Sequence, residues 1–352
     1  MLGLFSKKPS SLLGIDINAA SVTLLALSRQ GAGYRVEAYA REALAANVLL
    51  DQHIADPEAV AMALSRAWRR SGSRLKDVAV AVAGDAVISK VIEVPAGLSD
   101  DDLESQLALE AGQYIPYPLE DVALDFEVQG CVPGKPLRQR ALLVACRNEL
   151  VESLESVLAL AELTPRVVDT QPLALERCLL MLAAQLPVTA LSAVALLDIG
   201  PNLTTFSVLF DRQVIYAREQ LFGTRPLMAA LEQRFALAPE AVLLAQRQGG
   251  LPEGCNEALQ AFEQEVLQQA SRSLQLFADS PGQPPVAWLL LAGEGSRLVG
   301  LDRQVERQVG IATRIANPFL NMSVSSQVDA RTLADDAPSL LLACGLAMRG
   351  FD

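Results

Sequence analysis

The sequence has one histidine, five scattered cysteines and no apolar run long enough to cross a membrane. The histidine, His53, lies in a polar stretch before Pro57, and no Cys, Asp or Glu set surrounds it at ligand spacing. This excludes Ser-His-Asp and Cys-His catalysis and any metal site built on several histidines. The cysteines form no CxxC pair, which predicts reduced thiols in place of disulfides or a zinc site.

Basic residues are also few and dispersed. The chain carries 29 Lys and Arg against 41 Asp and Glu, for a net charge of −12. Nucleic-acid binding needs clustered basic side chains, so we expect no nucleic-acid partner. The longest apolar stretches, 285–292 and 340–348, fall short of the ~20 residues that a membrane-spanning helix needs. Residues 1–8 lack the apolar region of a signal peptide, and we therefore expect a cytosolic protein.

One short pattern occurs twice: an apolar strand that ends in Asp-Ile and is followed by a small polar turn. The copies, 12–22 and 195–205, place Asp16 and Asp198 about half of the 352-residue chain apart. A third apolar strand, 287–291, leads into the glycine turn 292–296. Small turn residues let backbone N–H groups approach a phosphate, and a carboxylate at a strand end can hold hydrated Mg²⁺. The pattern predicts two similar halves that close on one phosphate-bearing ligand.

Strands and helices alternate in each half, which predicts an α/β protein with mixed sheets. The length suits two domains. We expect the first half to comprise residues 1–186 plus 337–352, and the second to comprise residues 187–336. Within the first half, residues from about 84 to 161 read as an inserted βαββα unit, with strands at 122–128 and 140–147 around a Pro/Gly loop.

These motifs resemble the actin-like ATPase superfamily. Asp16 and Asp198 match its two phosphate turns, and residues 291–297 match its adenosine turn. Its two connecting segments match residues 171–176 and 342–347. Within the superfamily, four segments resemble the PilM family of type IV pilus assembly proteins, and this match spans essentially the whole chain: 13–17, 114–118, 125–128 and 218–223. The resemblance implies a duplicated ribonuclease-H-like fold with an inserted subdomain, 1C, of the kind found in FtsA.

The resemblance also implies partners. The chain would be a cytosolic scaffold of the inner-membrane pilus assembly complex, and it would reach the membrane only through its partners. The cytosolic amino-terminal tail of PilN would bind between the first core subdomain and the insert. Pilus motor ATPases and a second copy of the chain are further candidates. Tyr114, Ile115 and Tyr117 are candidate partner contacts, and the alternative is that this segment merely ends a helix and packs on the insert's own sheet.

The resemblance assigns nucleotide-binding roles to residues of the three turns and of a helix expected over 239–248. In an ATP or ADP complex, Asp16 and Asp198 would hold Mg²⁺ through water. The assigned residues are Asp16, Asn18, Ala19, Ala20, Ser21, Asp198, Gly200, Asn202, Thr204, Thr205, Arg247, Gly293, Glu294, Gly295 and Ser296.

The turns depart from the family pattern in ways that weaken nucleotide binding. Ala19, Ala20 and Thr23 stand where the family has Ser, Thr and Lys. Gln171 stands at the position of the acidic residue that orients the attacking water, and Glu294 replaces a glycine near the base. Each lost charge-assisted contact is worth ~1.5–3 kcal/mol. We therefore expect weak or absent ATP binding and negligible hydrolysis.

Two other functions share the same core. A small-molecule kinase would need a carboxylate or Arg facing the γ-phosphate, and Asp169 and Arg177 are the nearby candidates. Their alternative roles are structural, as a strand-end cap and a helix-surface charge. A filament-forming, FtsA-like protein is the other alternative, although the insert replaces the subdomain that actin filaments use.

Overall fold

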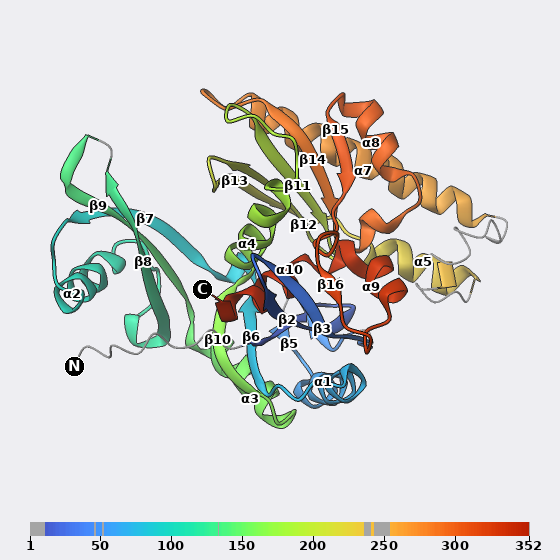
Figure 1. The fold of residues 1–352 in the computed structure, drawn as a ribbon, viewed down its shortest axis with the longest axis horizontal. Helices are drawn as coiled ribbons and strands as arrows, with labels where there is room; N and C mark the ends of the chain where they lie inside the picture. Colours follow the sequence, from blue (N-terminus) through green and yellow to red (C-terminus); the bar gives the residue numbers. More distant parts are fainter. Residues whose placement is uncertain are drawn as a thin grey trace.

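The computed structural model describes residues 11–45, 47–50, 53–132, 134–235, 241–242 and 254–351. Two large sheets lie on either side of a pair of central helices, and a smaller sheet projects away from the first (Figure 1). Among the described helices, none combines the length and apolar character needed to span a bilayer.

The first sheet has the strand order β10-β6-β1-β2-β3-β16. Strands β1, β2 and β3 form an antiparallel meander. Strands β6 and β10 extend the sheet in parallel on the other side of β1. Helices α1 and α3 pack on its outer face. The bounds are β1 Leu13–Ile17, β2 Ser21–Gln30, β3 Gly33–Ala43, β6 Asp77–Val82, β10 Thr164–Thr170, β16 Ser323–Val324, α1 Pro57–Ser71 and α3 Asn148–Leu160.

The second sheet repeats this plan with the order β13-β12-β11-β14-β15. A meander is again extended in parallel beside its first strand, and α5, α7 and α8 cover the outer face. Asp16 pairs with Thr23 and Asp198 pairs with Thr205, so the two acidic turns occupy equivalent positions. The bounds are β11 Ala193–Ile199, β12 Thr204–Phe210, β13 Gln213–Gln220, β14 Val286–Ala292, β15 Ala312–Ile315, α5 Arg225–Phe235, α7 Cys255–Ala278 and α8 Leu301–Val309.

Helices α4 (Gln171–Ala183) and α10 (Leu341–Met348) form the layer between the two sheets (Figure 1). Their buried side chains join those of β2 and β11 in one core, so the two halves share a hydrophobic interior. The helices cross closely at Gly345, where an added Cβ would lie 1.9 Å from the carbonyl oxygen of Ala174. Only glycine allows this approach of two backbones.

The insert is a three-stranded antiparallel sheet with the order β7-β9-β8 and one helix, α2. It has its own small core, which includes Val94, Leu107 and Leu143. The hairpin of β8 and β9 is longer than predicted, because Gly130, at a φ of 100°, is accommodated by a bulge instead of starting a loop. The bounds are β7 Ile88–Pro95, α2 Asp100–Ala111, β8 Val122–Val132 and β9 Lys135–Arg147.

Two smaller elements lie near the site described below. A short hairpin of β4 (Leu49–Leu50) and β5 (His53–Ile54) lies between β3 and α1 in the chain. Helix α9 (Ala330–Asp336) precedes α10 and is separated from it by a short 3₁₀ turn. The helix expected over 239–248 falls outside the described residues except at 241–242.

Candidate functional site

A cavity of about 650 Å³ opens between the two halves and continues toward the insert. Its polar end is formed by the β1–β2 turn, the β11–β12 turn and the glycine turn after β14. Its apolar end is formed by the β4–β5 hairpin, α3 and the base of the insert. The cavity therefore combines the predicted phosphate turns with a neighbouring hydrophobic groove.

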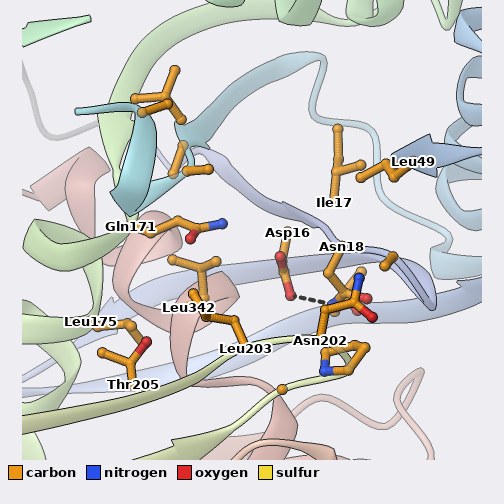
Figure 2. A pocket seen from close by; sticks show the side chains of 18 of the residues that line it. Asp16, Ile17, Asn18, Leu49, Gln171, Leu175, Asn202, Leu203, Thr205 and Leu342 are labelled. Carbon is orange, nitrogen blue, oxygen red and sulfur yellow. Dashed lines mark hydrogen bonds between the residues drawn. The ribbon is translucent and has the colours of Figure 1, made fainter. Parts of the chain in front are cut away.

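In the first turn, the side chain of Asn18 forms hydrogen bonds with backbone amides that a bound phosphate would otherwise use. Its Oδ1 accepts hydrogen bonds from the backbone N–H groups of Ala20 and Ser21, each at 3.0 Å. Its Nδ2 donates to Oδ2 of Asp16, also at 3.0 Å (Figure 2). Asn favours such local bonds in turns because its short side chain mimics a backbone turn. Two amides and one carboxylate of the turn are thus already paired within the chain.

The second turn is closed by backbone bonds. The N–H of Gly200 donates to the carbonyl of Leu203 at 2.9 Å, and that of Arg225 donates to the carbonyl of Pro201 at 2.8 Å. The side chains of Asn202 and Thr205 lie along the cavity (Figure 2). In the described part of the chain, the Asn202 side chain has no bond to the amides of its turn, so this turn lacks the cap that Asn18 gives to the first.

The glycine turn brings a third carboxylate to the cavity. Gly293 has a φ of 77°, and a Cβ there would lie 2.5 Å from Oδ1 of Asp198. The turn can pass this close to Asp198 only because the residue is glycine. Glu294 follows it and lines the cavity. The polar end therefore contains Asp16, Asp198 and Glu294.

Arg41, at the end of β3, lies among these acidic groups. Its Nε donates to Oγ of Ser21 at 3.0 Å, and its guanidinium forms an ion pair with Glu294. Its Nη1 lies 3.7 Å from Asp336. Sequence reasoning missed Arg41. The signal was its place near the end of β3, which the meander carries back to the edge where the first turn lies.

Burial raises the pKa of both turn aspartates. The pKa of Asp198 is about 7, because burial and the charges of Asp16 and Glu294 all oppose its ionisation. The pKa of Asp16 is about 6, since burial is partly offset by the bond from Asn18 and the charge of Arg41. Near neutral pH, each carboxyl is therefore partly protonated. The described residues also form no group of three or more His, Cys, Asp or Glu that could hold a metal ion.

These features fit Mg-ATP poorly. Asn18 occupies two amides of the first turn, and the three carboxylates repel phosphate oxygens. Arg41, the cation at this end, is already paired with acidic side chains. Gln171 lines the cavity, but its amide is not a base that could activate water. We therefore derive no catalytic step through a bound nucleotide.

The structure brings most of the predicted nucleotide-site residues to one cavity and places others outside its lining. Those that line it are Asp16, Asn18, Ala19, Ser21, Gln171, Asp198, Gly200, Asn202, Thr205, Gly293 and Glu294. Ala20, Thr204, Gly295 and Ser296 do not line it. The hydroxyls of Thr204 and Ser296 donate instead to the carbonyls of Phe222 and Gly293, and Arg247 lies outside the described residues.

The candidate kinase residues face one another away from the cavity. Nη1 of Arg177 lies 3.2 Å from Oδ2 of Asp169, and Nε of Arg349 lies 3.6 Å from the same oxygen. Arg177 also donates to the carbonyl of Gly345 at 3.3 Å. Neither Asp169 nor Arg177 is among the described lining residues. Their contacts join β10, α4 and the carboxyl-terminal turn, which is a structural role.

The apolar end is lined by aliphatic side chains from separate elements. They are Ile17, Leu49, Ile54, Ile88, Leu150 and Leu154. Figure 2 shows Ile17 beside Leu49. In the sequence, Ile17 lies between Asp16 and Asn18 of the polar end. Tyr117 also lines the cavity and lies below the guanidinium of Arg147, whereas Ile115 is buried in the core of the insert and Tyr114 lies outside the lining.

Comparisons with known proteins agree with the duplicated architecture. The family of type IV pilus assembly protein PilM matches residues 14–351. The chain is similar to a chain of the PilM-PilN type IV pilus biogenesis complex, with 26% identity and a TM-score of 0.79 over 98% of this chain and 100% of that one. It shares its fold with the ethanolamine utilization protein EutJ from Carboxydothermus hydrogenoformans, with 15% identity and a TM-score of 0.54 over 97% and 90% of the two chains. The predicted actin-like fold and family are confirmed, and the chain belongs to the PilM family of type IV pilus assembly proteins.

Proposed function

We propose that this chain is a scaffold of the type IV pilus assembly complex that binds the amino-terminal tail of a PilN partner in the apolar end of its cavity. The observation that carries the proposal is a groove lined by aliphatic side chains between the first sheet and the insert. The similarity to a chain of a PilM-PilN complex supports the identity of the partner. The membrane contact is then made by PilN.

The groove has the composition of a peptide site. Leu49 and Leu154 are almost fully buried and form its base, whereas Ile54 and Leu150 are half-buried and accessible to a ligand. Cavities of about 300–1,000 Å³ with apolar walls and few polar groups are typical of ligand sites. A short segment with two or three apolar anchors would bury them here, and such anchors carry most of the binding free energy of a peptide.

Polar groups at the rim would orient the peptide. Arg147 is about half exposed and pairs with Glu149 at 2.9 Å. Its guanidinium lies 5.7 Å from the centre of the Tyr117 ring, which is 44% exposed. Tyr117 thus offers both an aromatic face and a hydroxyl at the mouth of the groove. This arrangement supports a contact role for Tyr117 and gives no such support to the buried Ile115.

Nucleotide has a minor role in this proposal. The capped first turn and the three carboxylates favour weak or absent binding of ATP or ADP with Mg²⁺, and negligible hydrolysis. The scaffold would then bind its partner without depending on nucleotide.

The test is a fluorescence-polarisation titration of a labelled PilN amino-terminal peptide. We expect saturable binding to the wild type and at least about tenfold weaker binding to Leu150→Gln, because the variant removes an apolar wall of the groove. Leu160→Gln is the matched control, since Leu160 lies on the same helix, is 56% exposed and is outside the cavity lining. Absence of wild-type binding, or equal loss in both variants, contradicts the proposal.

A second pair of variants tests the rim. Tyr117→Ala should weaken the peptide several-fold, whereas Tyr114→Ala should not, because only Tyr117 lines the cavity. Both side chains are about 40% exposed, so neither change should impair folding, and thermal unfolding can confirm this. Equal peptide affinities of the two variants would show that Tyr117 does not contact the peptide.

A further inference from the structure

Arg41 joins three parts of the chain that meet at the cleft. It projects from β3 in the first sheet, and its Nε holds Oγ of Ser21 at the first turn. Its guanidinium pairs with Glu294, which follows β14 of the second sheet. It also lies 3.7 Å from Asp336, the last residue of α9. One side chain therefore contacts both walls of the cleft.

Further charged and polar side chains surround this arginine. Arg297 lies 2.9 Å from Oδ1 of Asp336, and the hydroxyl of Tyr39 donates to Oδ2 at 2.6 Å. Two guanidinium groups thus face two carboxylates, Glu294 and Asp336. The side chains of Arg41, Glu294 and Asp336 are only 17%, 18% and 13% exposed. Removing one member of such a shielded pair leaves its partner as a poorly hydrated charge, which is costly.

Asn18 completes the arrangement on the other side of Ser21. Its carboxamide oxygen accepts from the Ala20 and Ser21 amides, the position where an anionic ligand would accept. Arg41 supplies the positive charge that would otherwise have to come from a bound cation near Glu294. The amides of the first turn and the carboxylate of Glu294 are therefore paired with the chain's own side chains.

We infer that Arg41 and Glu294 form an internal latch that holds the two halves of this protein closed without a nucleotide, while Asn18 caps the first turn. The inference rests on the proposed nucleotide-independent scaffold and names the residues that bring that independence about. Arg41 and Glu294 are the two sides of the latch, and Asn18 caps the amides of Ala20 and Ser21 in the neighbouring first turn.

Hydrogen exchange measured by mass spectrometry tests the latch directly. We expect Arg41→Gln and Glu294→Gln each to speed exchange in the β1–β2 turn and the glycine turn by at least about tenfold, because local opening of the cleft becomes easier. The double variant should exchange no faster than the more affected single variant, since each single change already removes the ion pair between Arg41 and Glu294. Exchange unchanged in either single variant, or strictly additive effects, overturns the inference.

Arg35→Gln is the matched control. Arg35 lies on the same strand, and its pair with Glu37 is 3.8 Å long with both side chains about 40% exposed. Surface pairs of this kind contribute little, so exchange in the two turns should stay at the wild-type rate. An increase as large as that of Arg41→Gln would show that loss of any arginine on this strand loosens the sheet, and would overturn the latch.

Adding Mg-ATP to the wild type separates this inference from the scaffold proposal. A latched cleft should gain no protection in either turn, whereas protection by ATP would overturn the latch. The peptide titration described above has its own readout in the apolar groove. If the protein binds the peptide but ATP protects the turns from exchange, the scaffold proposal stands and the latch is wrong. If ATP gives no protection and the peptide does not bind, the latch stands and the scaffold proposal is wrong.

Discussion

The two halves have the same strand order and the same backbone hydrogen bond across the acidic turn. They differ in how the other amides of that turn are hydrogen-bonded. The N–H of Asn18 donates to the carbonyl of Ser21 at 3.0 Å, and the N–H of the equivalent Gly200 donates to that of Leu203 at 2.9 Å. The backbone of the turn is therefore the same in both halves. Asn18 has a side chain that caps two further amides, whereas Gly200 has none, so this position decides whether the turn is capped by the protein's own side chain.

The charges beside the two turns differ as well. Asp16 has Asn18 and Arg41 beside it, and both favour its ionised form. Asp198 is opposed by burial and by the two neighbouring carboxylates, and its pKa is accordingly the higher of the two. In the first turn, Asp16 is stabilised by the neighbouring Asn18 and Arg41, whereas in the second turn no such neighbour among the described residues favours the ionised form of Asp198.

The largest expected effect comes from the layer that joins the halves. Gly345→Ala places a Cβ against the Ala174 backbone, which cannot move away without separating α4 from α10. We expect the free energy of unfolding to fall by about 3 kcal/mol, the upper part of the range for overpacked cores. Urea denaturation measures it, with Gly112→Ala as the control, because a Cβ there meets its nearest atom at 3.8 Å. Similar losses in both variants would contradict close packing at Gly345.

The second prediction compares the two aspartates through pH. Each has a folded-state pKa above that of an unfolded Asp, near 3.8, so the folded state keeps its proton at pH values where the unfolded chain has lost it. The contribution of each group to stability is therefore greatest at low pH and falls as the pH rises toward its folded pKa of about 6 or about 7.

Replacing either aspartate by asparagine removes this loss. The stability of Asp198→Asn relative to the wild type should improve by about 2 kcal/mol between pH 5 and pH 8, because the variant has no charge to bury. Asp16→Asn should improve by about half as much, since its pKa is the lower. Thermal and urea unfolding at the two pH values provide the measurement. Identical pH dependence of wild type and variants would show that these carboxyls ionise normally.

The third prediction makes the first turn resemble the second. Asn18→Gly removes the side chain that accepts two backbone N–H bonds and donates to Asp16. We expect a loss of about 1.5 kcal/mol in the free energy of unfolding, because two backbone amides of the turn lose their acceptor. Asn202→Ala in the second turn should change stability by less than about 0.5 kcal/mol, the usual range for substitutions away from such features. Equal costs would mean that the two turns do not differ as described.

The smallest predicted effect makes the second half resemble the first. Val22 and Thr204 occupy equivalent places in the two sheets, but the buried Thr204 hydroxyl donates to the carbonyl of Phe222 at 2.9 Å. Thr204→Val should cost about 1 kcal/mol, because it leaves that carbonyl without its partner. Thr205→Val, on the cavity side, is the comparison and should be close to neutral. Chemical denaturation of both variants decides whether Thr204 is structural.

The repeated pattern was enough to predict two similar halves, because strand periodicity and turn chemistry are local, whereas the actin-like fold followed from the family resemblance. The ends of α1 also have local causes: Asp56 caps the helix, Pro57 begins it and Gly72 ends it in a left-handed conformation. The β8–β9 hairpin was predicted too short, since Gly130, which the sequence places in a loop, lies within the paired strands.

The site was less predictable because it depends on residues far apart in the chain. Arg41 and Glu294 are brought together only when the two sheets close on α4 and α10. The hydroxyls of Thr204 and Ser296 resemble phosphate ligands in the sequence, but the fold directs them to carbonyls. Leu49 and Leu150 come from a short hairpin and a helix, and no sequence spacing indicates that they line one groove.

The most direct test of the central claim is the affinity of a labelled PilN amino-terminal peptide for the wild-type protein, measured with and without a millimolar excess of Mg-ATP. We predict saturable binding with the same dissociation constant in both conditions, because the aliphatic side chains of the groove lie between the first sheet and the insert, apart from the phosphate turns. No binding, or binding that appears only when Mg-ATP is present, would contradict a nucleotide-independent scaffold.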